Sequence, residues 1–418
     1  MTNSSAEGPH SLSARKVIEQ AVRDSYGRLL AFLAARSRDV AAAEDALADA
    51  LKAALETWPR TGVPEKPEAW LLTAARRRLI DVARHSRVKA EAVPTLLTLV
   101  DEAQDLASAD DIFPDERLKL LFVCAHPAID AGVRTPLMLQ TVLGLDAARI
   151  ASAFLVQPSA MGQRLSRAKA KVRVARVAFE IPTTNELPPR LTAVLEAIYA
   201  AYGSGWDDVA GADPRRKGLA VEAIDLGRLL TRLMPDQPEA LGLLALMLHC
   251  EARRDARRTP GGGFVPLSEQ DVTRWSEAMI EEAEKYLGAA AMRGQLGRFQ
   301  LEAAIQSAHA QRAQTGRTDW EAVALLYEAL VRVAPTIGAL VGCAAAAAEA
   351  RGAETGWRTL EAIPVDAVKS YQPYWAVAAH LLKRMQRASD AQAAYSRAIG
   401  LCEDSETREF LIGQSRAP

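Results

Sequence analysis

The sequence lacks the features of secreted, membrane-bound and disulfide-stabilised proteins. Its four cysteines are scattered over 418 residues with no paired spacing, so we expect buried, reduced thiols. No apolar run approaches the roughly 18 residues of a membrane span. Residues 1–16 are polar, without the apolar core of a signal peptide. We therefore expect a cytoplasmic protein that does not contact membranes, with a disordered leader over residues 1–13.

Catalytic and cofactor-binding patterns are also missing. We find no nucleophile with a paired base, no cysteines and histidines at metal-ligand spacing, and no phosphate-binding loop. The glycines at 261–263 lack the Lys and the Ser or Thr of such a loop, so we interpret them as a flexible connector. The sequence thus predicts that the protein is not an enzyme and binds no metal or other cofactor.

Aromatic residues are few, and the net charge is small. Aromatics make up 6% of the chain and apolar residues 49%, which together with many alanines favours helices over sheets. We therefore expect an all-α fold of about three domains, at roughly 100–200 residues each. The formal net charge is −1, so any affinity for nucleic acid must come from local patches.

The stretch from Leu137 to Arg176 has the outline of a helix-turn-helix. Gly144 ends an apolar stretch, Asp146 is a good N-cap for a short helix, and Pro158 stands where a longer helix would begin. Apolar residues in that longer helix recur at spacings of four, three and four, which predicts one buried stripe. The stripe consists of Met161, Leu165, Ala168 and Val172.

The remaining faces of this helix are basic and carry no acidic residue. They present Gln163, Arg164, Arg167, Lys169, Lys171, Arg173 and Arg176. Such a helix can place its first turns in the major groove of DNA while the later cations neutralise phosphates. For one helix taken alone, a solvated basic face is an equally good explanation.

Residues 14–90 predict an earlier helical domain with two differently charged helices. One helix runs from Ala41 to Trp58, and its exposed face carries Glu44, Asp45, Asp49 and Glu56. The next helix begins after Pro67 and carries Trp70, Arg76, Arg77, Arg78, Asp81, Arg84 and Arg87. An acidic face suits a basic protein surface, and an arginine-rich helix suits DNA phosphates.

These motifs resemble those of extracytoplasmic-function (ECF) sigma factors of the sigma-70 family. Regions 2.2 to 2.4 of that family are similar to AAEDALADALKAALETWP followed by KPEAWLLTAARRRLIDVARHSR. Regions 4.1 and 4.2 are similar to DERLKLLFVCAHPAID and LGLDAARIASAFLVQPSAMGQRLSRAKAKVR. The second pair of motifs resembles the group that has a long tetratricopeptide-like (TPR-like) C-terminal extension.

The resemblance implies two partners, core RNA polymerase and promoter DNA. Binding to the β′ clamp, in an assembly that also involves the β flap, falls to Glu44, Asp45 and Asp49. Contacts to the −10 element fall to Trp70, Arg76, Arg77, Arg78, Asp81 and Arg84. Contacts to the −35 element fall to Ser159, Gln163, Arg164, Arg167, Lys169 and Lys171.

Several of these positions have a second interpretation or depart from the family pattern. Core packing explains Trp70 at least as well as base contact, and Asp81 can pair with a neighbouring arginine. Ala48 stands where the family usually has a glutamine, and Arg77 where an asparagine is common. These departures concern the polymerase contact and the −10 base preference.

The remaining segments are a linker and a C-terminal array. Residues 91–114 are acidic, with no Lys or Arg, and are either a solvated linker or, by the resemblance, a strand in the RNA exit path. Residues 188–418 read as an irregular TPR-like helical extension, because similar patterns around Tyr327 and Tyr395 lie 68 residues apart, two periods of 34. We expect residues 14–90 and 115–180 to be the two sigma domains.

The sequence therefore predicts an ECF sigma factor that joins core polymerase and recognises promoter DNA. The resemblance implies that the extension regulates it, by holding a regulatory protein or by intramolecular docking on its concave face. The alternative is a helix-turn-helix regulator with a TPR-like interaction domain that never joins polymerase. A third, less favoured interpretation is a helical scaffold protein that uses the C-terminal array.

Overall fold

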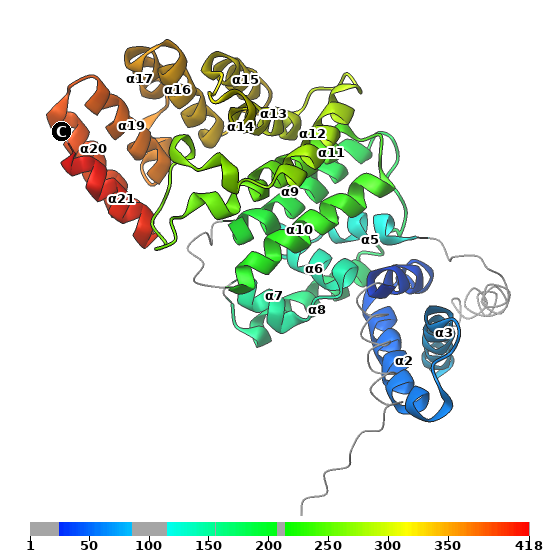
Figure 1. Ribbon diagram of the computed structural model, residues 1–418. Coiled ribbons are helices and arrows are strands. Elements are labelled where there is room, and N and C mark those ends of the chain that lie inside the picture. The colour runs from blue at the N-terminus through cyan, green and yellow to red at the C-terminus, as the bar shows by residue number, and fades with distance from the viewer. Residues whose placement is uncertain (1–24, 86–114, 155, 207–213, 418) are drawn as a thin grey trace, which may run out of the picture. The chain divides into compact units, whose positions relative to one another are not determined.

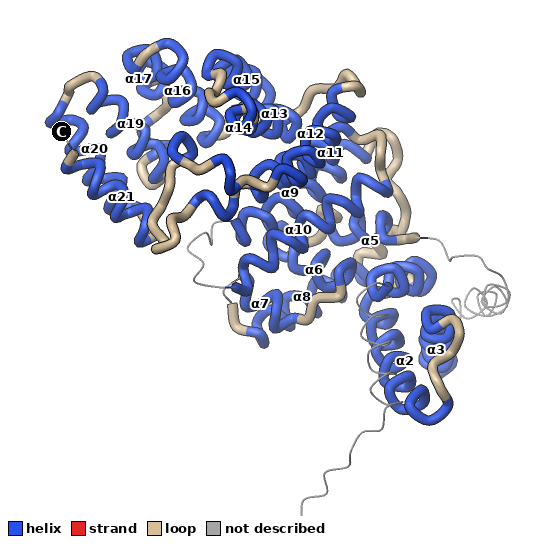
Figure 2. The backbone as a smooth tube through the Cα atoms, in the orientation of Figure 1, coloured by secondary structure: helices blue, strands red, loops and turns tan. Residues whose placement is uncertain are grey.

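The structure, a computed structural model, describes residues 25–85, 115–154, 156–206 and 214–417, and these are almost entirely helical (Figure 1; Figure 2). Within these ranges the strand-like pairing is confined to an isolated bridge between Arg258 and Phe264, so the predicted all-α fold is confirmed. The leader at 1–13 and the acidic linker at 91–114 lie outside the described residues. The chain divides into two compact units, Met1–Ser204 and Gly205–Pro418.

The N-terminal helical domain consists of the helical residues 25–37, α2 (Val40–Thr61) and α3 (Pro67–His85). α2 begins where an Asp39 carboxylate oxygen accepts a hydrogen bond from the Ala42 backbone N–H at 3.1 Å, which satisfies one free donor of the first turn. α2 and α3 pack together, and the rings of Trp58 and Trp70 meet edge to face with centroids 5.5 Å apart.

The helix-turn-helix domain is built from four helices, and the last three follow the order that the sequence predicts for the stretch from Leu137 to Arg176. These are α5 (Arg117–Cys124), α6 (Ala131–Leu143), α7 (Ala147–Ala153) and α8 (Pro158–Val174). Gly144 ends α6 with a left-handed φ of 73°, and Asp146 accepts a hydrogen bond from the Arg149 N–H at 2.8 Å at the start of α7. Pro158 is the first residue of α8. All four residues of the predicted apolar stripe of α8 are buried.

The two domains of the first unit approach each other so closely that a glycine is required. A Cβ built on Gly27 would lie 1.8 Å from the backbone oxygen of Val142 in α6. A Cβ on Gly144 would lie 2.8 Å from the ring of Tyr26. The helical residues 25–37 therefore pack directly on the end of α6, with backbone against backbone at Gly27 and the Tyr26 ring against the backbone at Gly144.

A fifth helix, α9 (Leu187–Trp206), belongs mostly to the first unit. The Thr135 hydroxyl of α6 donates a hydrogen bond to the Ala197 carbonyl at 2.8 Å, and Arg190 donates one to the Phe122 carbonyl of α5 at 3.0 Å. The sequence pattern grouped this helix with the C-terminal array from residue 188. The structure instead bonds it to the helix-turn-helix domain.

The second unit is a succession of helices that pack on their neighbours in the chain. Its α-helices are α10 (Pro214–Leu233), α11 (Pro238–Ala252), α12 (Glu277–Ala291), α13 (Arg298–Ala310), α14 (Arg312–Thr315), α15 (Trp320–Val333), α16 (Ile337–Arg351), α17 (Ala353–Glu361), α18 (Val365–Val368), α19 (Gln372–Arg384), α20 (Ala388–Leu401) and α21 (Ser405–Arg416). Two apolar clusters form its core over α13 to α21, and Tyr395 lies in one of them. This arrangement is the irregular helical array that the sequence predicts.

Residues 258–270, which we call the strap, cross from α11 toward the end of the array. The Arg258 guanidinium binds both carboxylate oxygens of Asp404 at 3.1 Å, and the ring of Phe264 meets that of Phe410 with centroids 5.3 Å apart. The three glycines predicted to be a flexible connector form a tight turn here, closed by a Thr259 N–H to Gly263 carbonyl bond of 2.9 Å. The strap is therefore tied to α21.

Two predictions about composition can be compared with the structure. Cys124, Cys343 and Cys402 are buried free thiols as predicted, whereas Cys250 is also free but partly exposed. No helix in the described ranges combines the length and apolarity that a membrane crossing requires.

Candidate nucleic-acid and protein interface

The three acidic residues predicted to bind another protein lie on α2 in three different environments. Asp45 and Asp49 are exposed, and Glu44 is half-buried. Glu44 accepts a hydrogen bond from Lys169 of α8. Burial, together with the Glu44 carboxylate, raises the pKa of Tyr26 above its usual range. Asp45 makes no ion pair within the described part of the chain, so it is the acid most accessible to a partner.

The basic helix α8 presents most of its predicted DNA-binding residues to solvent. The exposed residues are Ser159, Gln163, Arg164, Arg167 and Lys171. Arg167 donates a hydrogen bond to the Gln163 carbonyl at 3.3 Å, which keeps both residues on one side of the helix. With the apolar stripe buried on the opposite side, these residues form a polar and cationic ridge of the kind that enters a major groove.

Lys169 is the exception among the predicted DNA-binding residues. It is 8% exposed, and its ammonium group donates to Glu44 of α2 and to the Gln140 side chain of α6, the latter at 3.0 Å. One turn further along, Arg173 lies 3.6 Å from the Asp39 carboxylate. In this arrangement Lys169 faces a protein carboxylate and not solvent, because α8 packs on α2.

The predicted −10 residues on α3 are divided between the core and the surface. Arg76 is buried at 5% exposure with its guanidinium 4.7 Å from the ring centroid of Phe32, a cation–π contact. Arg77 and Asp81 are exposed. The side chain of Arg84 lies outside the described residues.

Two further α3 residues contact α2. Arg78 pairs with Asp49 at 2.7 Å, and both side chains are about half exposed. Trp70 packs edge to face on Trp58, which supports the core-packing interpretation of this tryptophan, although it remains partly exposed. Of the predicted −10 side chains that the structure describes, Arg77 and Arg78 are thus the most accessible cations.

Sequence reasoning missed the residues that join the two domains. Tyr26, Gly27 and Gly144 form the close backbone approach described above, and Asp39 combines a cap with an ion pair. Asp39 has a local signal as a good N-cap before a helical run, and Gly144 has one as the end of an apolar stretch, but neither signal indicates a contact between domains. The other contacts depend on pairs more than 100 residues apart in the sequence, such as Gly27 and Val142, which no local pattern reveals.

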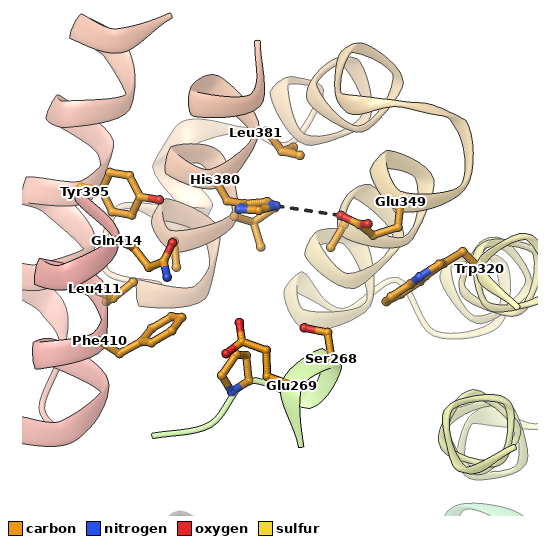
Figure 3. Close-up of a pocket in the computed structure, with 14 residues that line it drawn as sticks. Ser268, Glu269, Trp320, Glu349, His380, Leu381, Tyr395, Phe410, Leu411 and Gln414 are labelled. Carbon is orange, nitrogen blue, oxygen red and sulfur yellow. Dashed lines mark ion pairs between the residues drawn. The ribbon is translucent and has the colours of Figure 1, made fainter. Parts of the chain in front are cut away.

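A pocket of about 350 Å³ lies in the second unit between the strap and helices α16, α19 and α21 (Figure 3). Its lining is mostly apolar and includes Trp320, Val377 and Phe410. His380 Nε2 lies 3.9 Å from Glu349 Oε1, and burial with the nearby Arg384 lowers the pKa of His380. The volume is at the lower end of the range for small-ligand sites. No group of three or more potential metal ligands occurs in the described ranges.

Comparison with known proteins places this architecture in a family. Residues 21–88, which include α2 and α3, match sigma-70 region 2, and residues 190–291 match a family of unknown function, DUF6596. An uncharacterized protein of Rhizobium meliloti (strain 1021) is 38% identical over 378 residues, covering 90% of this chain and 89% of that protein. The match to sigma-70 region 2 supports assignment of the chain to the sigma-70 family. Members of that family are transcription initiation factors and not enzymes. The chain therefore belongs to the same family as the Rhizobium meliloti protein and carries a sigma-70 region 2 at its N-terminal end.

Proposed function

We propose that the protein is an ECF-type RNA polymerase sigma factor that binds core polymerase and directs recognition of −10 and −35 promoter elements. The observation that carries the proposal is the pairing of a sigma-70 region 2 with a separate helix-turn-helix domain. The acidic helix of the first offers a protein-binding face, and the basic ridge of α8 offers a DNA-binding face. Region 2 itself implies binding to core polymerase and promoter DNA.

In this proposal the acidic residues of α2 bind polymerase, and the basic residues of α3 and α8 bind promoter DNA. Asp45, with Asp49 and Glu44, contacts the clamp of the β′ subunit, while the helix-turn-helix domain lies near the β flap. The −10 element meets α3, where Arg77 and Arg78 are the accessible cations among the side chains that the structure describes. The −35 element meets the α8 ridge of Ser159, Gln163, Arg164, Arg167 and Lys171.

The direct test is capture of purified core RNA polymerase by the full chain, compared with Asp45→Ala. Asp45 is exposed and makes no ion pair within the described residues, so its removal changes the partner surface without breaking an internal contact. Glu65→Ala is the matched control, since Glu65 is an exposed acid between α2 and α3. Capture that Asp45→Ala weakens and Glu65→Ala does not would support the proposal. Failure of the wild-type chain to bind core would contradict it.

The rival function, a DNA-binding regulator that works without polymerase, is favoured by one observation. The α8 ridge is exposed in the free chain, so it needs no other protein to uncover it. The two functions differ in how DNA binding depends on core polymerase. A regulator binds its site alone, whereas the sigma factor binds promoter DNA tightly only in the presence of core. A gel-shift titration with and without core polymerase distinguishes them.

We further propose that the C-terminal array is a TPR-like regulatory extension that receives an intramolecular or external partner. The pocket between the strap and α21 supports a binding role, because it is apolar and of ligand size. Val377→Trp would occupy part of this pocket and narrow it. If the pocket regulates initiation, this substitution should change transcript yield in a reconstituted assay, while Val365→Trp, at an exposed position of α18, should not.

A further inference from the structure

The pocket between the strap and α21 is lined by several polar groups that have no hydrogen-bond partner in the protein. Tyr395 of α20 is 3% exposed, and Figure 3 shows its hydroxyl pointing into the pocket. Within the described ranges, none of the side chains of Tyr395, Glu269 and Gln414 makes a hydrogen bond. A buried polar group without a partner is rare in folded proteins, and a few such groups around an apolar cavity are typical of a ligand site.

The charged groups of the pocket favour a positively charged ligand. The described residues that line it include the carboxylates of Glu269 and Glu349 but no lysine or arginine. Glu349 pairs with Arg384, whereas Glu269 makes no ion pair within the described part of the chain. His380 lies 3.9 Å from Glu349 and is neutral at pH 7, because burial lowers its pKa below the usual value. Among the described lining residues, Glu269 is therefore the carboxylate that lacks a counter-charge.

The apolar wall of the pocket comes from three helices and is held in place by aromatic contacts. It includes Trp320 of α15, Val377 of α19 and Phe410 of α21. The Trp320 ring meets the ring of His309 edge to face with centroids 5.3 Å apart, and Phe410 meets Phe264 of the strap at the same distance. Aromatic rings bind apolar groups and also attract cations to their faces. The wall thus suits a ligand that combines an apolar body with a positive charge.

The strap limits the occupant of the pocket to a small molecule. Ser268 and Glu269 of the strap form one side of the pocket (Figure 3). The strap is held at one end by the pairing of Arg258 with Asp404 and near the other by Arg312, which donates a hydrogen bond to the Ser268 carbonyl. A segment held at both ends closes this side to an extended peptide. The occupant must therefore fit within about 350 Å³, a volume typical of the smaller ligand sites.

We propose that this pocket binds a small organic cation, whose apolar body packs on Trp320 and Phe410 and whose amino group pairs with Glu269. The inference rests on the binding role proposed above for the pocket and adds the chemical class of its ligand. Tyr395 supplies a hydroxyl that bonds a polar group of the bound molecule. An anionic ligand of the same size is disfavoured, because it would bring a second negative charge next to Glu269.

The test compares three indole compounds by isothermal titration calorimetry of the full chain at pH 7. Tryptamine carries a protonated amine, tryptophol a neutral hydroxyl and indole-3-acetate a carboxylate, all on the same ring system. We expect tryptamine to bind about 5-fold more tightly than tryptophol, the upper end of what a solvent-accessible ion pair contributes. Indole-3-acetate should bind more weakly than either of the other two compounds.

Two substitutions identify the site of binding. Glu269→Gln removes the charge but keeps the shape of the side chain, so it should reduce the affinity for tryptamine to that for tryptophol and leave the affinity for tryptophol unchanged. Val377→Trp narrows the pocket and should weaken the binding of all three compounds. The matched controls are Glu354→Gln, at an exposed position of α17, and Val365→Trp on α18, and both should bind as the wild type does. Circular dichroism checks folding, and Glu269→Gln, at an exposed position, is sufficient for the test if Val377→Trp does not fold.

The outcomes separate the ligand class from the regulatory role of the pocket. If tryptamine does not bind at about 10 mM, a concentration that fills even a millimolar site, or binds no better than tryptophol, the ligand class is overturned. A change of transcript yield in Val377→Trp would then still support the regulatory role. If tryptamine binds as expected, but neither tryptamine nor Val377→Trp changes the transcript yield, the ligand class stands and the regulatory role is overturned. A preference for tryptamine that Glu269→Gln abolishes supports the proposal.

Discussion

Replacing Gly27 by alanine should destabilise the first unit by about 1–3 kcal/mol, the usual cost of overpacking a well-packed contact. The magnitude follows from the close approach to α6. A Cβ on Gly27 would lie 1.8 Å from the Val142 oxygen, and real Cβ atoms essentially never come closer than 3.0 Å to such an atom. The two backbones must therefore separate by at least 1.2 Å, the difference between these distances. The obstructing atom belongs to the backbone and has no rotamer to move it aside.

Thermal unfolding measured by calorimetry or circular dichroism tests this cost. For a unit of about 200 residues, a loss of 2 kcal/mol lowers the melting temperature by roughly 4–8 °C. Gly162→Ala is the control, because Gly162 lies in α8 with no atom near its would-be Cβ. Alanine there should be neutral or stabilise by up to about 1 kcal/mol, since glycine is a poor helix former. Equal melting temperatures for wild type and Gly27→Ala would refute the close packing of the two domains.

Three further predictions concern DNA, the domain boundary and acid stability. Arg164→Ala and Arg167→Ala should each weaken −35 binding of the holoenzyme by about 1–3 kcal/mol if they contact bases, and unchanged affinity in a competition gel shift would show that another face of α8 reads DNA. A chain ending at residue 186 should have a free energy of unfolding at least about 1–3 kcal/mol lower than that of a chain ending at residue 206, since the buried Thr135 hydroxyl loses its Ala197 acceptor. Identical melting temperatures would place α9 outside the first unit. Burial and nearby arginines lower the pKa of His249 and His309 to about 4. Their neutral forms therefore stabilise the second unit above pH 6.5, and this contribution, of order 3 kcal/mol each, is lost as the pH falls from 6.5 towards 4. Melting temperatures between pH 7 and pH 4 should show this loss and show less of it for His249→Gln.

The helix-turn-helix could be predicted residue by residue because its signals are local. A left-handed glycine, an N-capping aspartate and a proline at a helix start each act within one turn of the backbone. The apolar stripe of α8 depends only on helical periodicity. For these reasons Gly144, Asp146 and Pro158 are found where the pattern placed them.

The boundary before the extension was harder to predict, because a proline can either interrupt a helix or stand in its first turn. The predicted extension begins at residue 188, where the sequence has Pro188 and Pro189 side by side. The structure places both in the first turn of α9, where the missing N–H groups would have no helical partner in any case. The prolines thus start a helix that the first unit uses, and the change of unit comes only after Ser204.

The exposure of charged residues could not be predicted from the sequence either. Helical periodicity identifies the apolar face of a helix, but it does not tell which polar residue meets another domain. Arg76 lies against Phe32 and Lys169 lies against Glu44, although both fit the pattern of a DNA-binding face. Their partners lie 44 and 125 residues away in the sequence, respectively.

The acidic residues of α2 and its N-cap contact basic residues within the chain as well as any external partner. Acidic residues were assigned to polymerase and basic residues to DNA, yet Asp39, Glu44 and Asp49 each pair with a cation from a predicted DNA-binding helix. The Asp49–Arg78 pair is about half exposed and contributes under about 1 kcal/mol, so either partner can displace it readily. Lys169 and Glu44 are largely covered, and breaking that pair leaves a poorly hydrated charge unless a new partner replaces the old one. Salt screens exposed pairs more than covered ones. Added salt should therefore release Arg78 well before it releases Lys169, and the α2–α8 contact should yield to a competing protein surface more readily than to ionic strength.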